Sequence, residues 1–496
     1  MGPELLFFLS SGLFLGWSLG ANDAANLFGT AVGSRMVRAR AAAVVCSLGV
    51  ILGAVVGGAG AAHTLGRLGA VNTLPGAFTV ALAAALATLA MTRCGLPIST
   101  GQAIVGAIIG WNIYAGMVTG SRALSQIVAS WVLCPLLAGA AAVGLYLLLH
   151  AVLRRSRIHL LRQDALLRAG LLLVGAFGAY SLGANNIANV MGVFLPDNPF
   201  RDVTVLGVTL SAAQLLFLLG GLAIAAGIMT YSDRVIRMVG SRLLQLSPEA
   251  ALVVVLAQSL VLYVFASEGL EAWLAARGLP TLPLVPVSSS QAVVGAIIGL
   301  GLMRGGRGIR LRPLGGIGLG WVATPLAAGV IAFFLLFFVD NVFDQQVARS
   351  SLFRFDAEVL GQAGRAGIAG ETLSLWQGRE GKNAMRLQQA LERDAGLTRA
   401  EAQRLLELAE VVPVHIDLDR AGLHLDEEWL GPDATRALHS LAGRRFEHRW
   451  QLREALAKKS PLWRERQDTP LNRAWNRDVR DKLAYIERVF SAGSGP

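Results

Sequence analysis

The stretch Ser18-Leu-Gly-Ala-Asn-Asp-Ala-Ala-Asn-Leu-Phe-Gly29 places one carboxylate and two amides inside an apolar run that begins at Leu5. Polar and ionisable groups at the depth of a bilayer are costly, and they usually face a cavity or a substrate path. We therefore expect Asp23, together with Asn22 and Asn26, to line a polar site within a membrane helix.

A second copy of this stretch, Ser181-Leu-Gly-Ala-Asn-Asn-Ile-Ala-Asn-Val-Met-Gly192, is identical to the first at eight of twelve positions. It contributes three further amides, those of Asn185, Asn186 and Asn189. We expect Gly20 and Gly29 to loosen the helix around the polar groups of the first copy, because glycine has the widest backbone freedom.

Two further blocks are repeated in the same order. Pro97-Ile-Ser-Thr-Gly-Gln-Ala-Ile-Val-Gly-Ala-Ile-Ile-Gly110 matches Pro286-Val-Ser-Ser-Ser-Gln-Ala-Val-Val-Gly-Ala-Ile-Ile-Gly299 at ten of fourteen positions, and Trp131-Val-Leu-Cys-Pro-Leu-Leu-Ala-Gly139 corresponds to Trp321-Val-Ala-Thr-Pro-Leu-Ala-Ala-Gly329. Each half holds five apolar segments, an odd number, so the second half must enter the membrane from the opposite face. Inverted repeats of this kind are characteristic of secondary transporters.

The apolar stretches that are long enough to cross or enter a bilayer are 5–31, 39–65, 77–92, 101–118, 123–150, 165–194, 206–231, 250–266, 286–303 and 314–339. A full crossing needs about 20 residues. The short stretch 77–92 either crosses or pairs with 101–118 as a re-entrant hairpin. The sequence thus predicts an all-α polytopic membrane protein of two inverted repeats with broken or re-entrant helices, followed by a mainly helical soluble C-terminal domain.

The net charge of +11 does not indicate nucleic-acid binding, because many arginines cluster in short loops between apolar stretches. The clusters are Arg35/Arg38/Arg40, Arg154/Arg155/Arg157/Arg162, Arg234/Arg237/Arg242 and Arg304/Arg307/Arg310/Arg312. With ten crossings and the N-terminus outside, all four clusters fall on the cytoplasmic side. This orientation predicts a multi-pass protein of the cell inner membrane, with the N-terminus and the C-terminal domain outside the cytoplasm.

The expected division of the chain is a first transmembrane repeat over 1–150, a basic cytoplasmic linker over 151–163, a second inverted repeat over 164–342 and a soluble domain over 343–496. Within that last domain, helical periodicity is present at Met385–Glu392 and Arg399–Glu410, and apolar and polar residues alternate at Val412–Leu418.

The Pro-x-Ser blocks place hydroxyls and amides just ahead of apolar helical runs. The residues concerned are Ser99, Thr100, Gly101, Gln102, Ser288, Ser289, Ser290 and Gln291. At the N-terminal end of a half-helix, unpaired N–H donors and the positive end of the helix dipole favour an anion. One such block is equally an ordinary helix start. Two in corresponding places predict a donor-lined cage for a tetrahedral oxyanion.

Asp23 is the only acidic residue well inside an apolar stretch. Together with Asn22, Asn26, Asn185, Asn186 and Asn189 it offers oxygen ligands suited to Na⁺, and a protonatable carboxylate also suits coupling to H⁺. The alternative interpretation is a hydrogen-bonded structural Asp that holds an unwound helix.

These motifs resemble the signatures of the PiT-type inorganic phosphate transporters, over roughly residues 1–340. The resemblance implies two inverted halves, phosphate contacts at the hydroxyl blocks, and cation contacts at Asp23, Asn26 and Asn189. Two features depart from the family pattern: Asn186 stands where Asp is usual, and Gln102 and Gln291 stand where His is usual. Losing a proton-accepting carboxylate weakens selection against sulfate.

We therefore predict a secondary active transporter, not an enzyme, that takes up inorganic phosphate coupled to Na⁺ or H⁺ and needs no cofactor. The alternatives are a permease for another oxyanion such as sulfate, or a membrane-anchored anion sensor that uses the C-terminal domain. No Gly-Lys-Ser or Gly-Lys-Thr phosphate loop is present, which disfavours ATP-driven transport. The expected partners are the anion and the lipid bilayer, with no nucleic acid; a homodimer is compatible with the sequence.

Overall fold

The computed structural model describes residues 3–33, 36–69, 71–93, 99–156, 159–198, 200, 202–205, 208–239, 247–303, 305–306, 311–368, 372–418 and 425–490. Two compact units can be distinguished. The first, which we call the helical unit, comprises Met1–Tyr114, Thr119–Glu271 and Thr281–Arg349. The second, the C-terminal unit, comprises Ala115–Val118, Ala272–Pro280 and Ser350–Pro496.

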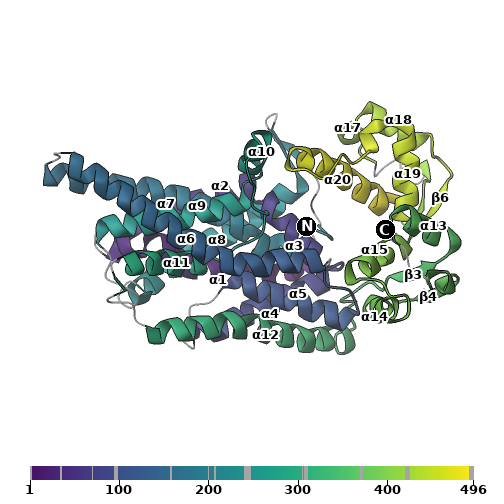
Figure 1. Cartoon of the computed structure of the whole chain (residues 1–496), viewed down its shortest axis with the longest axis horizontal. Coiled ribbons are helices and arrows are strands. Elements are labelled where there is room, and N and C mark those ends of the chain that lie inside the picture. Colours follow the sequence, from purple (N-terminus) through teal and green to yellow (C-terminus); the bar gives the residue numbers. More distant parts are fainter. Residues whose placement is uncertain are drawn as a thin grey trace. The chain divides into compact units, whose positions relative to one another are not determined.

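The first part of the chain is almost entirely helical (Figure 1). Its elements are α1 (Pro3–Gly33), α2 (Ala39–Gly57), α3 (Ala59–Leu68), α4 (Leu74–Arg93), α5 (Thr100–Ala115), α6 (Ser121–Arg155), α7 (Leu160–Met191), η1 (Gly192–Phe194), β1 (Val203–Val205), β2 (Val208–Leu210), α8 (Ala212–Val239), α9 (Pro248–Ala266), α10 (Glu268–Ala276), α11 (Ser289–Met303) and α12 (Leu311–Asn341). Strands β1 and β2 form a small antiparallel hairpin between α7 and α8.

Eight helices among the described residues are long and apolar enough to cross a membrane: α1, α2, α4, α6, α7, α8, α9 and α12. Helices α5 and α11 have 16 and 15 residues, which corresponds to about 24 and 22 Å, less than the roughly 30 Å of a hydrocarbon core. Of the ten expected stretches, eight thus contain a helix that is a candidate crossing by length and composition, and the other two, 101–118 and 286–303, form half-helices. The reason at α11 is Pro286, which disfavours helical backbone in the residue before it.

The repeated stretches lie in the second half of α1 and at the C-terminal end of α7, where glycines bring helices of different halves together. A Cβ atom added at Gly20 of α1 would lie 2.0 Å from the carbonyl oxygen of Ile224 in α8. A Cβ at Gly183 of α7 would lie 2.1 Å from the carbonyl oxygen of Val50 in α2. The expectation that Gly20 and Gly29 loosen the helix is wrong, because α1 runs unbroken through the first stretch. Gly20 instead permits the close helix packing typical of membranes.

The half-helices are packed in the same way. A Cβ at Gly106 of α5 would lie 2.0 Å from the carbonyl oxygen of Pro325 in α12, and a Cβ at Gly295 of α11 would lie 2.1 Å from that of Pro135 in α6. The glycines belong to the second repeated block and the prolines to the third. Each half-helix is thus held by a long helix from the other half of the chain.

The C-terminal unit contains a four-stranded antiparallel sheet in the order β4-β3-β5-β6. After α12 the elements are β3 (Leu352–Phe355), α13 (Ala357–Arg365), η2 (Leu373–Trp376), β4 (Arg379–Gly381), α14 (Ala384–Asp394), α15 (Arg399–Ala409), β5 (Glu410–His415), α17 (Glu427–Leu430), α18 (Pro432–His439), β6 (Arg445–His448), α19 (Arg449–Lys459), η3 (Pro461–Trp463), η4 (Pro470–Asn472) and α20 (Arg473–Phe490). The predicted helices near 385–392 and 399–410 are present as α14 and α15.

The prediction of a mainly helical C-terminal domain missed this sheet. The alternation at Val412–Leu418 does overlap β5. The other three strands have only three or four residues, too few for an alternation of apolar and polar residues to stand out. The sheet and helices enclose two hydrophobic clusters, one around Phe355 and Trp376 and the other around Trp463 and Ile486.

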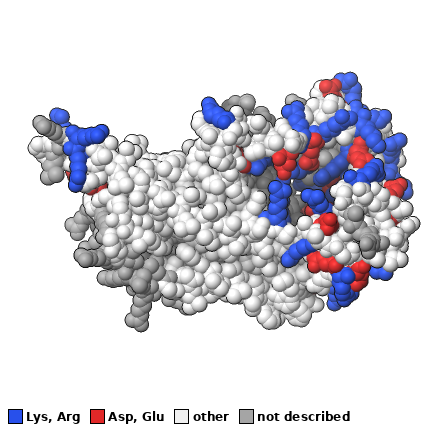
Figure 2. All heavy atoms as spheres, in the orientation of Figure 1, with Lys and Arg blue, Asp and Glu red and all other residues white. Residues whose placement is uncertain are grey.

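The positive charge of the protein belongs to its first part. Residues 1–349 hold 21 Lys and Arg against 11 Asp and Glu, whereas residues 350–496 hold 23 against 22. Figure 2 shows a broad uncharged side on the helical unit, with basic side chains over the adjoining ends of α6 and α7. Six of the arginines on which the predicted orientation rests lie outside the described residues: Arg35, Arg157, Arg242, Arg304, Arg307 and Arg310.

Candidate functional site

A network of polar side chains connects α1, α7 and the start of α11. Asp23 is only 3 % exposed. Its Oδ2 atom accepts hydrogen bonds from the Ser289 hydroxyl at 2.6 Å and from Asn186 Nδ2 at 3.1 Å, and its Oδ1 accepts one from Asn22 Nδ2 at 3.1 Å. The tertiary structure thus joins residues from both repeated stretches and from the second hydroxyl block at one carboxylate.

Asn186 holds the position in α7 that corresponds to Asp23 in α1. Its Oδ1 atom accepts from Asn185 Nδ2 at 2.9 Å and from Asn189 Nδ2 at 3.3 Å, while its Nδ2 donates to Asp23. The three Asn side chains are at most 2 % exposed. Every polar atom of the Asn186 amide therefore has a partner within the protein.

Asn185 fixes the segment that leads into α11. Its Oδ1 accepts from the Val287 N–H at 2.9 Å, and its Nδ2 donates to the Val287 carbonyl at 2.6 Å. The backbone before α11 is not helical, so its N–H and C=O groups have no partner within a helix. The Asn185 amide supplies a partner to both the N–H and the C=O of Val287. Asn185 thereby sets where Ser288 and Ser289 begin the half-helix.

Both half-helices begin in the same way. The Ser99 and Ser288 hydroxyls each accept a hydrogen bond, at 3.3 Å, from the backbone N–H of the residue three positions later. These are N-caps, the ordinary role of serine at a helix start. A Cβ added at Gly101 would lie 3.3 Å from Asn189 Nδ2, so the first turn of α5 lies against Asn189, which in turn donates to Asn186, the partner of Asp23.

Several buried amide atoms in this region have no protein partner among the described residues. They are Asn26 Nδ2, Gln102 Oε1, Asn189 Oδ1, Gln258 Oε1, and both Nε2 and Oε1 of Gln291. An unpaired buried polar atom costs about 1–3 kcal/mol. Three of these six atoms, those of Gln102 and Gln291, lie at the two half-helix starts, where a binding site for a polar ligand would give them partners.

The predicted site residues lie in three places: the two half-helix starts, the second half of α1 and the C-terminal end of α7. Asp23, Asn185, Asn186 and Asn189 are buried, as are all the described polar side chains of the hydroxyl blocks; Asn22 and Asn26 are half-buried. Pro97 lies outside the described residues. The sequence prediction did not include Gln258 of α9, whose Nε2 donates to the Asn26 carbonyl at 3.5 Å. A fully buried glutamine within an apolar stretch is the signal that could have found it.

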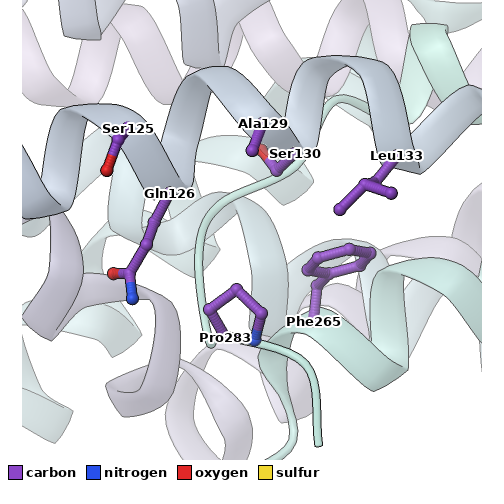
Figure 3. A pocket seen from close by; sticks show the side chains of 7 residues that line it. All are labelled: Ser125, Gln126, Ala129, Ser130, Leu133, Phe265 and Pro283. Carbon is purple, nitrogen blue, oxygen red and sulfur yellow. The ribbon is translucent and has the colours of Figure 1, made fainter.

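A cavity of about 310 Å³ lies beside α6 (Figure 3). It is lined by Ser125, Gln126, Ala129, Ser130 and Leu133 of α6, by Phe265 and by Pro283. Cys134, one residue beyond this lining, donates to the Ser288 carbonyl at 3.7 Å. None of the predicted site residues lines the cavity.

In the C-terminal unit, the described residues contain one group with the composition of a metal site: Asp356, Glu447 and His448. These side chains are already paired within the protein. His448 Nε2 lies 3.3 Å from Asp356 and its Nδ1 lies 2.9 Å from the Glu410 carbonyl, while Glu447 pairs with Arg354 at 2.7 Å. The group serves to tie the sheet to α13.

Comparison with known proteins gives consistent results. The model of the phosphate transporter family matches residues 19–272 and 277–396. The resemblance noted over residues 1–340 therefore extends further, and about the last hundred residues remain unassigned. A phosphate permease of Methanocaldococcus jannaschii is 28 % identical over 323 residues, covering 65 % of this chain and 93 % of its own.

Two other similar proteins bear on the substrate and the fold. The sulfate permease CysP of Bacillus subtilis is 28 % identical over 332 residues, covering 65 % of this chain and 85 % of its own. The solved structure titled "The sodium-dependent phosphate transporter" is 21 % identical with a TM-score of 0.54, covering 68 % of this chain and 98 % of its own. The last likeness shows a shared fold. The family match and the membrane helices together establish that the chain belongs to the phosphate transporter family, as a multi-pass membrane transporter and not an enzyme.

Proposed function

We propose that this protein takes up inorganic phosphate together with Na⁺ or H⁺, by alternating access between two inverted halves. The observation that carries the proposal is the Asp23 carboxylate, which is buried between α1, the last turns of α7 and the start of α11. A charge at that depth is retained where it binds an ion or a proton.

The coupling cation would bind at Asp23. The Ser289 hydroxyl and the Asn22 amide already contact the carboxylate, and they can reorient to present oxygen ligands to Na⁺. Protonation of Asp23 would serve H⁺ coupling through the same contacts. Because Ser289 opens α11, occupation of the cation site would order the half-helix that holds the anion.

The anion would bind between the first turns of α5 and α11. Their hydroxyl and amide side chains, together with the positive ends of two helix dipoles, supply donors with no formal charge. The contributing residues are Ser99, Thr100, Gly101, Gln102, Ser288, Ser289, Ser290 and Gln291. Of the unpaired amide atoms here, Gln291 Nε2 is a donor for an anion oxygen, and the oxygens of Gln102 and Gln291 can accept from the O–H groups of a protonated phosphate. Burying these atoms without a ligand is costly, which supports the proposed site.

Alternating access would arise from movement of one half against the other. Each half-helix packs through glycine on a long helix of the opposite half, as Gly106 does at Pro325 and Gly295 at Pro135. Close backbone contacts of this kind let helices slide as rigid bodies without repacking large side chains. The N-terminus is proposed to lie outside the cytoplasm, as the arginine loops indicate.

The test is uptake of labelled phosphate into proteoliposomes under a Na⁺ gradient, a proton gradient or neither. We expect Asp23→Asn to abolish the dependence on the gradient and most of the uptake. Asp164→Asn is the matched control, because Asp164 lies half-exposed near the start of α7, outside the site, and pairs with Arg168 at 2.8 Å. Gradient-dependent uptake that persists in Asp23→Asn would refute the cation assignment.

Sulfate is the second candidate substrate, favoured by the likeness to the sulfate permease of Bacillus subtilis and by the amide at Asn186. Unlabelled sulfate added to the same assay decides between them. Uptake that ignores sulfate supports phosphate, and uptake found only when sulfate is the labelled ion would overturn it.

A membrane-anchored anion sensor is separated from a transporter by removing residues 350–496. Truncation at this point keeps Val347 and Arg349, which belong to the helical unit through hydrogen bonds to Trp111 and Asn72. A transporter retains substantial uptake after this truncation.

A further inference from the structure

The two corresponding positions at the centre of the site differ in charge. Asp23 in α1 is a carboxylate, whereas Asn186 in α7 is a neutral amide. Among the described residues, the buried acidic side chains are Asp23 and Glu271, and Glu271 lies in α10, away from both repeated stretches. The site therefore offers one negative charge to a cation.

Asn186 is also unable to serve as a cation ligand in the observed arrangement. Its oxygen accepts from two amides, those of Asn185 and Asn189, and its nitrogen donates to Asp23. The amide nitrogen lies 3.1 Å from the carboxylate oxygen, where a second carboxylate would repel Asp23 unless a proton or another cation separated them. Asn186 thus replaces one cation by a hydrogen bond.

The anion that fits beside a single cation is a singly charged one. Among the residues whose side chains the structure describes, no Lys or Arg is buried, so a second negative charge on the anion would have no counter-charge from them. The unpaired buried atoms include three acceptor oxygens, on Gln102, Asn189 and Gln291. Acceptors suit the O–H groups of the phosphate monoanion, and sulfate offers none.

We propose that Asn186 limits this protein to one monovalent cation per phosphate, so that transport of the phosphate monoanion moves no net charge. This inference rests on the proposed function and adds its stoichiometry. A cycle that moved one net charge would respond to voltage, because about 100 mV acting on one charge changes an accumulation ratio roughly 45-fold. The neutral cycle has no such response.

The experiment measures the phosphate gradient at which net flux in proteoliposomes is zero, with the membrane potential clamped by potassium and valinomycin. For the wild type we expect the inside-to-outside ratio of phosphate at zero net flux to equal the outside-to-inside ratio of the coupling cation, to the first power. This phosphate ratio should stay unchanged when the membrane potential goes from zero to about 100 mV, inside negative. A second-power dependence, or a roughly 45-fold shift with voltage, would overturn the inference while leaving phosphate transport itself established.

Asn186→Asp tests the residue that sets the ratio. The added carboxylate should bring a second cation, so that zero flux follows the square of the cation ratio and shifts roughly 45-fold per about 100 mV, inside negative. Gln126→Glu is the matched control, because it adds a carboxylate in the cavity beside α6, outside the site. An Asn186→Asp variant that transports phosphate with wild-type stoichiometry would overturn the role of Asn186. Absence of phosphate flux in the wild type under every gradient would overturn the proposed function as well.

Discussion

Replacing Asn185 by Ala removes the link between α7 and the start of α11. The side chain is fully buried and makes two hydrogen bonds to one backbone residue, at 2.9 Å to the Val287 N–H and 2.6 Å to its carbonyl. Hydrogen bonds between membrane helices average about 0.6 kcal/mol and reach about 1.7, whereas a buried polar group left unpaired costs about 1–3 kcal/mol. Since both groups of Val287 lose their partner, we expect a loss of about 2 kcal/mol.

This loss should appear both in stability and in transport. For a protein of this size, about 2 kcal/mol corresponds to a decrease in Tm of roughly 2 °C, measurable by size-exclusion chromatography of heated detergent samples. If holding Ser288 and Ser289 in the binding position costs the same free energy in the variant, the phosphate concentration that gives half-maximal uptake rises roughly 25-fold. The proteoliposome assay measures this concentration.

Asn22→Ala is the matched control, because Asn22 is the corresponding residue of the first half. Its side chain is half-buried and its hydrogen bond is to Asp23, at 3.1 Å. We expect it to alter cation dependence with little effect on Tm. If Asn185→Ala kept wild-type Tm and the wild-type phosphate concentration for half-maximal uptake, the argument that Asn185 positions α11 would be refuted.

Three further predictions concern a close helix contact, the hydrogen bond to Asp23 and a buried carboxyl group of the C-terminal unit. Gly295→Leu should prevent normal folding, seen as loss of the monodisperse peak, because even a Cβ there would lie 2.1 Å from the Pro135 carbonyl; a folded variant would contradict the packing. Ser289→Ala should weaken cation activation of uptake about tenfold, because the 2.6 Å hydrogen bond to Asp23 is charge-assisted, and Ser289→Thr should restore it. Burial raises the pKa of Glu487 in α20 from its ordinary value of 4.5. The folded state therefore binds the proton more tightly, and stability is lost as the pH rises through the raised pKa. Glu487→Gln should accordingly gain Tm relative to wild type as the pH increases, and a pH-independent difference would contradict this.

The controls for these variants come from the chain itself. A Cβ added at Gly144 of α6 would meet no heavy atom of another segment within 4 Å, so Gly144→Leu should fold normally. Asp164→Asn serves as the control for Ser289→Ala, because it also changes a polar group in the membrane part without touching the site.

The sequence by itself determined that this is a membrane transporter with a polar centre. Asp23 could be singled out because a carboxylate within an apolar stretch is rare and costly, and the repeats could be found by direct comparison of the two halves. The same comparison showed that Asn186 stands in the second half where the first half has Asp23. Helix starts at Ser99 and Ser288 followed from the hydroxyl and the preceding proline, which act over a few residues.

The tertiary structure decided which of these residues meet and what the glycines do. The link from Asn185 to Val287 spans 102 positions in the chain, and no local pattern encodes it. From the sequence, Gly20 is expected to make the helix flexible. In the structure the backbone of Ile224 lies so close that only a residue without a side chain fits at position 20. Hydrophobic periodicity reports which face of a segment is buried, whereas the partner of a polar atom depends on segments distant in sequence. The hydrogen bonds at Asp23 therefore emerge only from the folded chain.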